Sequence, residues 1–228
     1  MALILCLETA TEACSVALGD GGKLVALNRA DAPMDHAARL TTLITSCLEN
    51  AGKGLRSLDA VAVSRGPGSY TSLRIGYSTA KGIAYGLGIP VLEIDTLQAL
   101  AVQGTAAANR PGALCCAMLD ARRMEAYYAI YTETGQQLQP PVAAELTPDM
   151  FDDYYAQGAF MVFTGNAVEK FSTIHVHARA LFSPMAASAE TFPALAEKKF
   201  REGVFADTAY CEPLYLKPPN ITQARAVL

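Results

Sequence analysis

The chain has 228 residues, 51% of them hydrophobic, and a formal net charge of −4. This composition supplies an ample core for one large domain or two small lobes, and it disfavours a protein that binds nucleic acid strongly by itself, because lysine and arginine provide most of the affinity for phosphate. No run approaches the ~18 apolar residues of a membrane span, and a strand-like segment follows Met1 without a basic leader, so we expect a cytoplasmic protein with no membrane partner.

The first half of the chain alternates between strand and helix patterns. Period-two alternation and turn residues predict strands, whereas apolar residues at helical spacing predict helices. In chain order we expect strands at Ala2–Leu7, Ser15–Leu18 and Lys23–Leu27, a helix at Asp35–Ala51, a strand at Ala60–Ser64, a helix at Ser72–Leu87, a strand at Val91–Ile94 and a helix at Thr96–Ala107.

The second half repeats this order after a turn-forming run at residues 109–112. We expect strands at Ala113–Leu119, Glu125–Thr132 and Gln137–Leu146, a helix at Pro148–Ala156, a strand at Phe160–Thr164, a helix at Ala167–Phe171, a strand at Ile174–Leu181 and a helix at Ala187–Glu202. Two such copies predict an α/β protein of two lobes, residues 1–109 and 110–228, each a mixed sheet flanked by helices. This is the duplicated ribonuclease-H-like arrangement of actin-like ATPases and sugar kinases.

A glycine-rich loop joins an expected strand to the helix at Ser72–Leu87. Loops of this kind often bind phosphate at a helix N-terminus, but the lysine of a P-loop is missing after Gly66. We therefore interpret Gly66, Pro67 and Gly68 as a structural turn, with Ser69 among the residues that can cap the helix.

The end of the first strand predicts a degenerate nucleotide hairpin. In this fold the hairpin carries an Asp near the metal and then a Gly-Thr turn that approaches phosphate, and here Glu8 and Ala10 stand in those places. A Cβ at Ala10 blocks close approach of phosphate, whereas hydroxyls remain at Thr9, Thr11 and Ser15. Glu8 is either a residual magnesium or polar anchor or a strand-end carboxylate that hydrogen-bonds the turn.

Metal-binding and nucleophilic patterns are missing from the sequence. His36 has no second histidine one helical turn away, and His175 and His177 fall in an expected strand, where two histidines without a third ligand are more often surface residues. The six cysteines form no C-x-x-C pair and are expected as reduced core thiols. No serine or cysteine has a recognisable His-Asp support, although a dyad formed by tertiary contact stays open. We predict no metal and no catalytic residue.

Several short motifs occur at specific places along the chain. The most specific is Arg65-Gly66-Pro67-Gly68-Ser69-Tyr70-Thr71 followed by Leu73-Arg74-Ile75-Gly76. The others are Glu8-Thr9-Ala10-Thr11 with Cys14–Leu18, Asp120-Ala121-Arg122-Arg123 with Glu125 and Tyr127, Gly165-Asn166, and Glu212–Leu216. Together they resemble the bacterial TsaB family, also called YeaZ, over nearly the whole chain. Ser72 stands where family members commonly have Gly, which adds a hydroxymethyl group at a tight contact.

This resemblance implies a role in forming N6-threonylcarbamoyladenosine on the tRNA adenosine 3′ of the anticodon. The chain would be a non-catalytic scaffold that activates the catalytic paralogue TsaD, with the ATPase TsaE joining the complex and tRNA bound through it. A homodimer is implied when TsaD is absent. No cofactor is expected in the isolated chain, whereas ATP or ADP and metal are expected on the partner subunits. Catalytic members of this branch bind their metal through a pair of helical histidines, and that pair is missing here.

The resemblance also implies a partner interface on the two helices at Asp35–Ala51 and Ser72–Leu87. Small residues on the second helix allow close helix approach, although packing on the lobe's own sheet explains them equally well. The residues assigned to this interface are His36, Leu40, Leu43, Ile44, Cys47, Ser72, Leu73, Gly76, Tyr77, Ala80 and Ile83.

Other interpretations of the chain stay open at this point. Arg122, Arg123 and Glu125 are expected at the first turn of the second lobe, either as solvated charges or as contacts to a partner or tRNA. The main alternative function is an active enzyme of the same superfamily, either an ATP-dependent small-molecule kinase or an M22-type peptidase. An independent RNA-binding module is disfavoured by the acidity of the chain.

Overall fold

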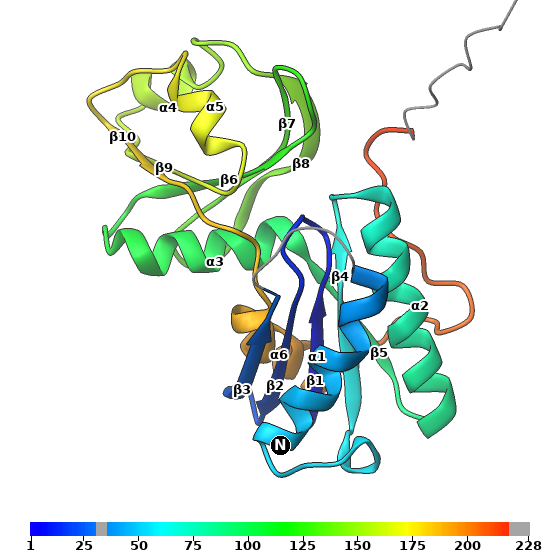
Figure 1. Cartoon of the computed structure of the whole chain (residues 1–228). Helices are drawn as coiled ribbons and strands as arrows, with labels where there is room; N and C mark the ends of the chain where they lie inside the picture. The colour runs from blue at the N-terminus through cyan, green and yellow to red at the C-terminus, as the bar shows by residue number, and fades with distance from the viewer. Residues whose placement is uncertain (31–35, 219–228) are drawn as a thin grey trace, which may run out of the picture.

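The computed structural model describes residues 1–30 and 36–218 (Figure 1). The first half follows the predicted order of elements, although Asp35 and the side chain of His36 lie outside the described residues. The elements are β1 (Leu3–Glu8), β2 (Ser15–Asp20), β3 (Lys23–Arg29), α1 (His36–Asn50), a 3₁₀ turn (Leu55–Ser57), β4 (Ala60–Gly66), α2 (Tyr70–Leu87), β5 (Val91–Asp95) and α3 (Thr96–Ala108).

The second half also keeps the predicted order. Its elements are β6 (Leu114–Asp120), β7 (Glu125–Tyr131), β8 (Gln137–Glu145), α4 (Asp152–Ala156), β9 (Met161–Thr164), α5 (Val168–Ser172), β10 (Ala180–Ser183), a 3₁₀ turn (Ala189–Thr191) and α6 (Phe192–Arg201).

Three boundaries in the second half differ from the prediction. The strand expected at Ile174–Leu181 is wrong for most of its length, because residues 174–179 form a turn and coil before β10. The helix expected from Pro148 begins only at α4, after turn residues. The last helix begins later than predicted, since Pro193 in its first turn lacks the N–H that an earlier start would use.

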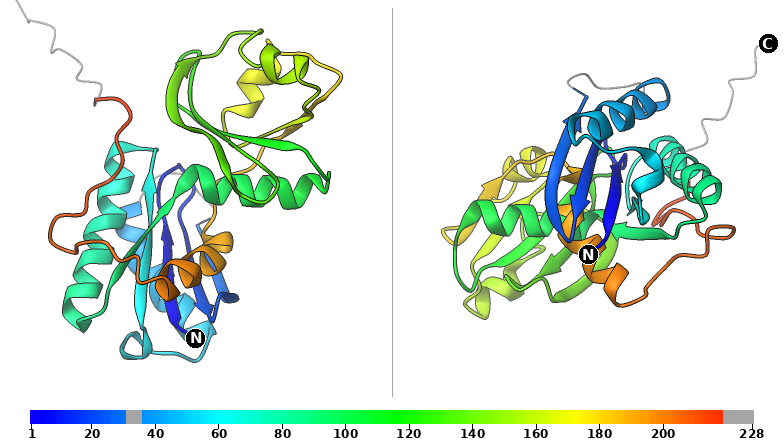
Figure 2. Two further views of the ribbon diagram at one scale, coloured as in Figure 1. Left: turned by 180° about the vertical axis from the view of Figure 1, so that it is seen from behind. Right: turned by 90° about the horizontal axis from the view of Figure 1, so that it is seen from below.

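Figure 2 shows the two lobes from two further sides. Each lobe is built on a five-stranded mixed sheet, and both sheets have the same strand order. The first runs β3-β2-β1-β4-β5, and the second, read in the matching direction, runs β8-β7-β6-β9-β10. In both, the three strands that come first in the chain pair antiparallel, and the next two add in parallel. This repetition confirms the predicted duplicated ribonuclease-H-like fold.

The helices that cover the two sheets are exchanged between the halves of the chain. α1 and α2 cover one face of the first sheet, but its other face is covered by α6, where Phe192 packs with Ile4. In turn α3 packs on the second sheet, where Leu97 and Leu100 lie with Ala117. The division expected between residues 109 and 110 stays a prediction, since these covering helices cross it.

Residues 203–218, here called the C-terminal strap, run back over the first lobe. The strap lies along β5 and α2, with the Ala206 N–H donating to the Val91 carbonyl at 2.9 Å and Lys81 Nζ donating to the Ala209 carbonyl at 3.2 Å. It ends at the second lobe, where Lys217 forms an ion pair with Glu125. No helix of the described chain is long and apolar enough to cross a membrane.

Candidate functional site at the end of β1 and on the helix pair

Glu8 ends strand β1 inside the protein. Its side chain is fully buried, and Oε1 accepts a hydrogen bond from the Ala10 N–H at 2.5 Å. Oε2 is also buried and has no hydrogen-bond partner in the described part of the chain. Burial raises the pKa of this carboxyl to about 7, because the charged form loses its hydration. The carboxylate therefore hydrogen-bonds its own turn and does not face solvent.

The turn after β1 packs directly on the glycine-rich loop before α2. The Thr9 N–H donates to Ser64 Oγ at 3.0 Å, and the Ser69 N–H donates to the Ala10 carbonyl at 2.7 Å. A Cβ at Gly68 would lie 2.3 Å from the Ala10 oxygen, so only glycine permits this approach. Ser69 is also the N-cap of α2 and accepts a hydrogen bond from the Ser72 N–H.

These contacts decide whether the turn fits a nucleotide phosphate. A phosphate-binding turn needs backbone N–H groups that point at the ligand. Here the amides of Thr9, Ala10 and Ser69 are used internally, and a carboxylate lies beneath them. The residues present therefore do not fit a phosphate-binding turn.

Metal ligands do not gather in the described ranges, 1–30 and 36–218. Within them no three His, Cys, Asp or Glu side chains are placed to hold a metal ion. That the chain uses no metal or cofactor stays a prediction.

The other residues of the predicted hairpin make structural contacts. A Cβ at Gly76 would lie 2.3 Å from Thr9 Oγ1, so α2 approaches the end of β1 closely at this glycine. Ser15 Oγ accepts a hydrogen bond from the Ala189 N–H at 2.9 Å, which ties the hairpin to the segment before α6. Thr11 is almost fully buried.

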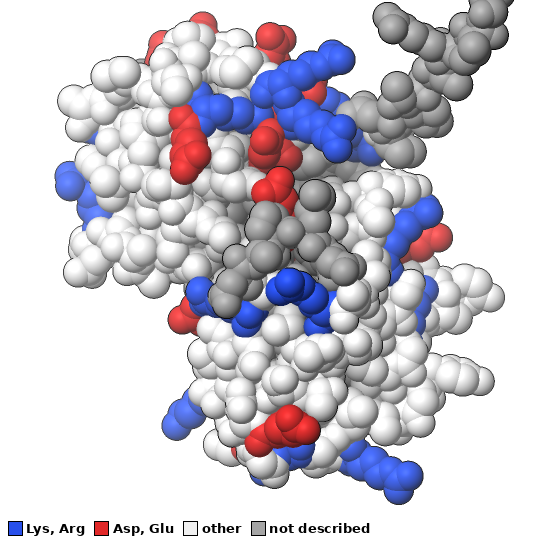
Figure 3. All heavy atoms as spheres, viewed as in Figure 1, with Lys and Arg blue, Asp and Glu red and all other residues white. Residues whose placement is uncertain are grey.

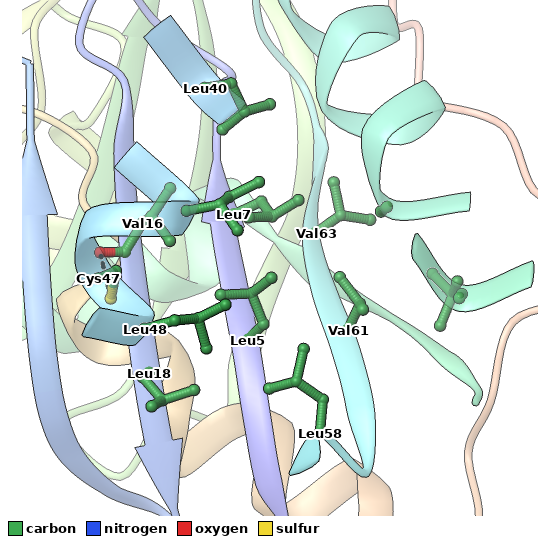
Figure 4. Close-up of a cluster of buried hydrophobic side chains, with 14 of the residues drawn as sticks. Leu5, Leu7, Val16, Leu18, Leu40, Cys47, Leu48, Leu58, Val61 and Val63 are labelled. Atoms are coloured by element: carbon green, nitrogen blue, oxygen red, sulfur yellow. Dashed lines mark hydrogen bonds between the residues drawn. The ribbon is translucent and has the colours of Figure 1, made fainter. Parts of the chain in front are cut away.

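Most residues predicted for the partner interface lie in the core of the first lobe. Figure 4 shows Leu40 and Leu48 of α1 directed toward Leu7 and Leu5 of β1, and Cys47 beside Val16 of β2. The buried members of the predicted set are Leu40, Ile44, Cys47, Leu73, Gly76, Tyr77 and Ala80, whereas Leu43, Ser72 and Ile83 are half-buried. The buried group packs the two helices on the sheet of their own lobe, and its part in a partner interface stays a prediction.

The surface that these helices expose is shallow and carries small side chains. A groove between the helices is lined by Ala37, Tyr70, Thr71, Arg74, Ile75, Ser78 and Thr79. Thr41 and Thr45 of α1 and Gly82 of α2 are also exposed. The sequence interpretation named the apolar side of each helix. The polar residues three and four positions apart on the opposite side could have identified the exposed face.

The position of His175 differs from the expectation that His175 and His177 are surface residues. It is 2% exposed, its Nδ1 lies 2.6 Å from the Pro148 carbonyl, and its Nε2 lies 2.8 Å from the Tyr155 hydroxyl. Its ring also stacks on Phe171. His177 stacks on the ring of Tyr155. Both histidines therefore belong to the aromatic packing of the second lobe.

The duplicated sheets with exchanged helices define a two-lobed protein of the actin-like ATPase fold whose nucleotide turn is altered. A sequence profile described as TsaD, tRNA N6-adenosine threonylcarbamoyltransferase, matches residues 30–224. The tRNA threonylcarbamoyladenosine biosynthesis protein TsaB of Escherichia coli is 30% identical over 94% of both chains. The chain belongs to the TsaB family.

Two further comparisons agree with this family. The Haemophilus influenzae TsaB protein is 39% identical over 55% of this chain and 52% of its own length. The crystal structure described as YeaZ from Pseudomonas aeruginosa superimposes with a TM-score of 0.80 at 28% identity, covering 95% of this chain and 100% of the other. The predicted resemblance to TsaB and YeaZ is confirmed.

Proposed function

We propose that this chain is a non-catalytic scaffold and activator in the biosynthesis of threonylcarbamoyladenosine on tRNA. Membership of a family whose Escherichia coli relative is named for this pathway supports the process. On this proposal the chain works in the cytoplasm, binds the catalytic threonylcarbamoyltransferase TsaD, is joined by the ATPase TsaE, and pairs with a second copy of itself when TsaD is absent. ATP or ADP and metal then belong to the partners.

The geometry at the end of β1 is the observation that carries the non-catalytic assignment. The Glu8 carboxylate is closed inside the lobe, and the amides that would bind phosphate are satisfied by Ser64, Glu8 and Ala10. This arrangement weighs against the alternative of an ATP-dependent kinase. In the part of the chain that the structure describes, no three side chains are placed to bind the metal that the peptidase alternative would use.

The exposed faces of α1 and α2 are the surface that we assign to TsaD. Thr45, Ser78 and Gly82 are exposed, small and uncharged, and small side chains let a partner helix approach closely. The buried residues beneath them fix both helices on the sheet, so the surface is formed before binding. This revises the predicted interface from the buried side of each helix to its outer side.

Reconstitution tests the proposal. Purified chain, TsaD and TsaE are mixed with an unmodified tRNA transcript, threonine, bicarbonate, ATP and the enzyme that makes the threonylcarbamoyl adenylate. We expect product only when the chain and TsaD are both present, and none from the chain alone. Unchanged product without the chain, or transfer by the chain alone, would refute the scaffold assignment.

A pair of charge insertions tests the interface. Ser78→Glu places a charge on the exposed face of α2 and is expected to abolish the heterodimer in size-exclusion chromatography. Ala106→Glu inserts the same charge on the exposed side of α3 and serves as the matched control, with normal assembly. A normal heterodimer with Ser78→Glu would remove this surface as the TsaD site.

A further inference from the structure

The turn between β6 and β7 holds two consecutive arginines in an unusual backbone conformation. Arg122 has a φ of +68° and Arg123 a φ of +49°, and among the described residues the one other non-glycine with positive φ is Asn109, which caps the end of α3. The left-handed region is disfavoured by roughly 1–2 kcal/mol per residue for side chains with a Cβ. Specific contacts must therefore hold this turn.

Lys170 of α5 supplies those contacts from below the turn. Its Nζ donates to Asp120 Oδ1 at 2.6 Å, to the Arg123 carbonyl at 2.9 Å and to the Glu125 carbonyl. The same Asp120 oxygen accepts the Arg122 N–H at 2.7 Å. The turn is thereby fixed through its backbone, and the two arginine side chains take no part in holding it.

Neither guanidinium group forms an ion pair with a carboxylate in the described chain. Arg122 and Arg123 are exposed, and neither side chain donates a hydrogen bond or forms an ion pair within residues 1–30 and 36–218. Asp120 pairs with Lys170 and Glu125 with Lys217, while Glu145 lies opposite Glu125 on β8. Figure 3 shows lysine and arginine atoms gathered on this side of the second lobe, near the end of the described chain. A chain with a net charge of −4 thus places two exposed arginines side by side at this turn.

We propose that Arg122 and Arg123 bind the phosphate backbone of tRNA in the assembled complex. This inference rests on the function proposed above and adds a substrate contact on this chain. Guanidinium groups match phosphate oxygens with paired N–H donors, and a preset turn loses little freedom on binding. An acidic protein partner is the competing occupant that the test below separates from tRNA, since arginine also occurs in protein interfaces.

The C-terminal strap reaches this turn and is anchored on the first lobe. The strap carries Tyr215 next to Lys217, and the Tyr215 ring packs on Tyr70 with centroids 4.5 Å apart. Arg74 lies over the Tyr70 ring and donates to the Tyr215 hydroxyl at 3.2 Å. These two half-buried rings hold the strap on α2, so that Lys217 reaches Glu125 while both arginine side chains of the turn stay exposed.

Binding of an unmodified tRNA transcript to the complete complex tests this inference. The double variant Arg122→Asn with Arg123→Asn removes both charges, and asparagine tolerates the left-handed conformation, so the turn is kept. We expect the Kd for tRNA to rise about tenfold, and the slope of log Kd against log salt to fall by roughly 2, one for each lost phosphate contact. Assembly and the transfer rate at saturating tRNA should not change.

Two further variants make the result specific. Arg122→Lys with Arg123→Lys keeps the charges and should retain the wild-type salt slope. Lys23→Asn with Lys53→Asn removes two exposed charges elsewhere on the first lobe and should leave the Kd unchanged. An unaltered Kd and slope for the asparagine variant in an active complex would overturn this contact and leave the proposed function intact. Loss of assembly with normal salt dependence would identify a protein contact instead, and an inactive wild-type complex would remove both proposals.

Discussion

The buried carboxylate of Glu8 makes the stability of this protein depend on pH in a calculable way. Its pKa is about 7 in the folded chain against an ordinary value of 4.5. Between these two pH values the folded state therefore holds a proton that the unfolded state has released. The contribution of this group to the free energy of unfolding is fully present below pH 4.5. It falls as the pH rises and is lost above pH 7.

The magnitude follows from the size of the shift. The free energy of unfolding should fall by about 1.4 kcal/mol per pH unit within this window, which amounts to about 3 kcal/mol in total. In Glu8→Gln the amide oxygen can still accept the Ala10 N–H, but no proton is bound or released. The buried amide NH₂ lacks a partner and lowers stability by ~1–3 kcal/mol at every pH.

The assay is urea denaturation of wild type and Glu8→Gln from pH 4.5 to pH 8.5. The stability of the variant relative to wild type should rise by about 3 kcal/mol across this range, while the constant effect of the amide cancels. Thr9→Val is the matched control, since it changes an adjacent buried side chain that does not titrate. A flat difference between Glu8→Gln and wild type would falsify the argument that a desolvated carboxylate ends β1.

Substitutions at other positions test the packing described above, each measured by urea denaturation. Gly76→Val should destabilise the isolated chain by about 1–3 kcal/mol or more, because its Cβ would meet Thr9, whereas Gly82→Ala, with open space around it, should stabilise α2 by ~0.5–1 kcal/mol. Equal effects at the two glycines would contradict the close approach of α2 to β1. His175→Phe keeps the ring but leaves the Tyr155 hydroxyl and the Pro148 carbonyl unpaired, so stability should fall by about 2–4 kcal/mol. A variant as stable as wild type would mean that these two hydrogen bonds contribute nothing.

The order of elements was predictable because it depends on local patterns. The apolar strand at Ala2–Leu7 and the helical spacing of Leu40, Ile44 and Cys47 are signals that the core of the first lobe requires. The departures at Glu8 and Ala10 could also be predicted from the sequence, because the nucleotide hairpin of this fold follows directly after the first strand.

Other features depend on contacts between distant segments. The alternation around His175 predicts a strand, yet Val176 is 91% exposed because the histidine turns into an aromatic cluster whose members come from α4, α5 and β9. The sequence alone does not separate the side of α2 that packs on its own sheet from the side that is exposed, for a similar reason. An apolar stripe indicates that a helix is covered, but it does not say whether by its own sheet or by a partner.

The exchange of α3 and α6 means that neither half of this chain is a complete folding unit. While the chain is being synthesised, one side of the β1 sheet stays bare until Phe192 and Ala196 have left the ribosome. The N-terminal lobe is thus completed by a helix that is made after the whole of the second sheet. A fragment that stops between the lobes would therefore expose the apolar face of its sheet and would not be a working half.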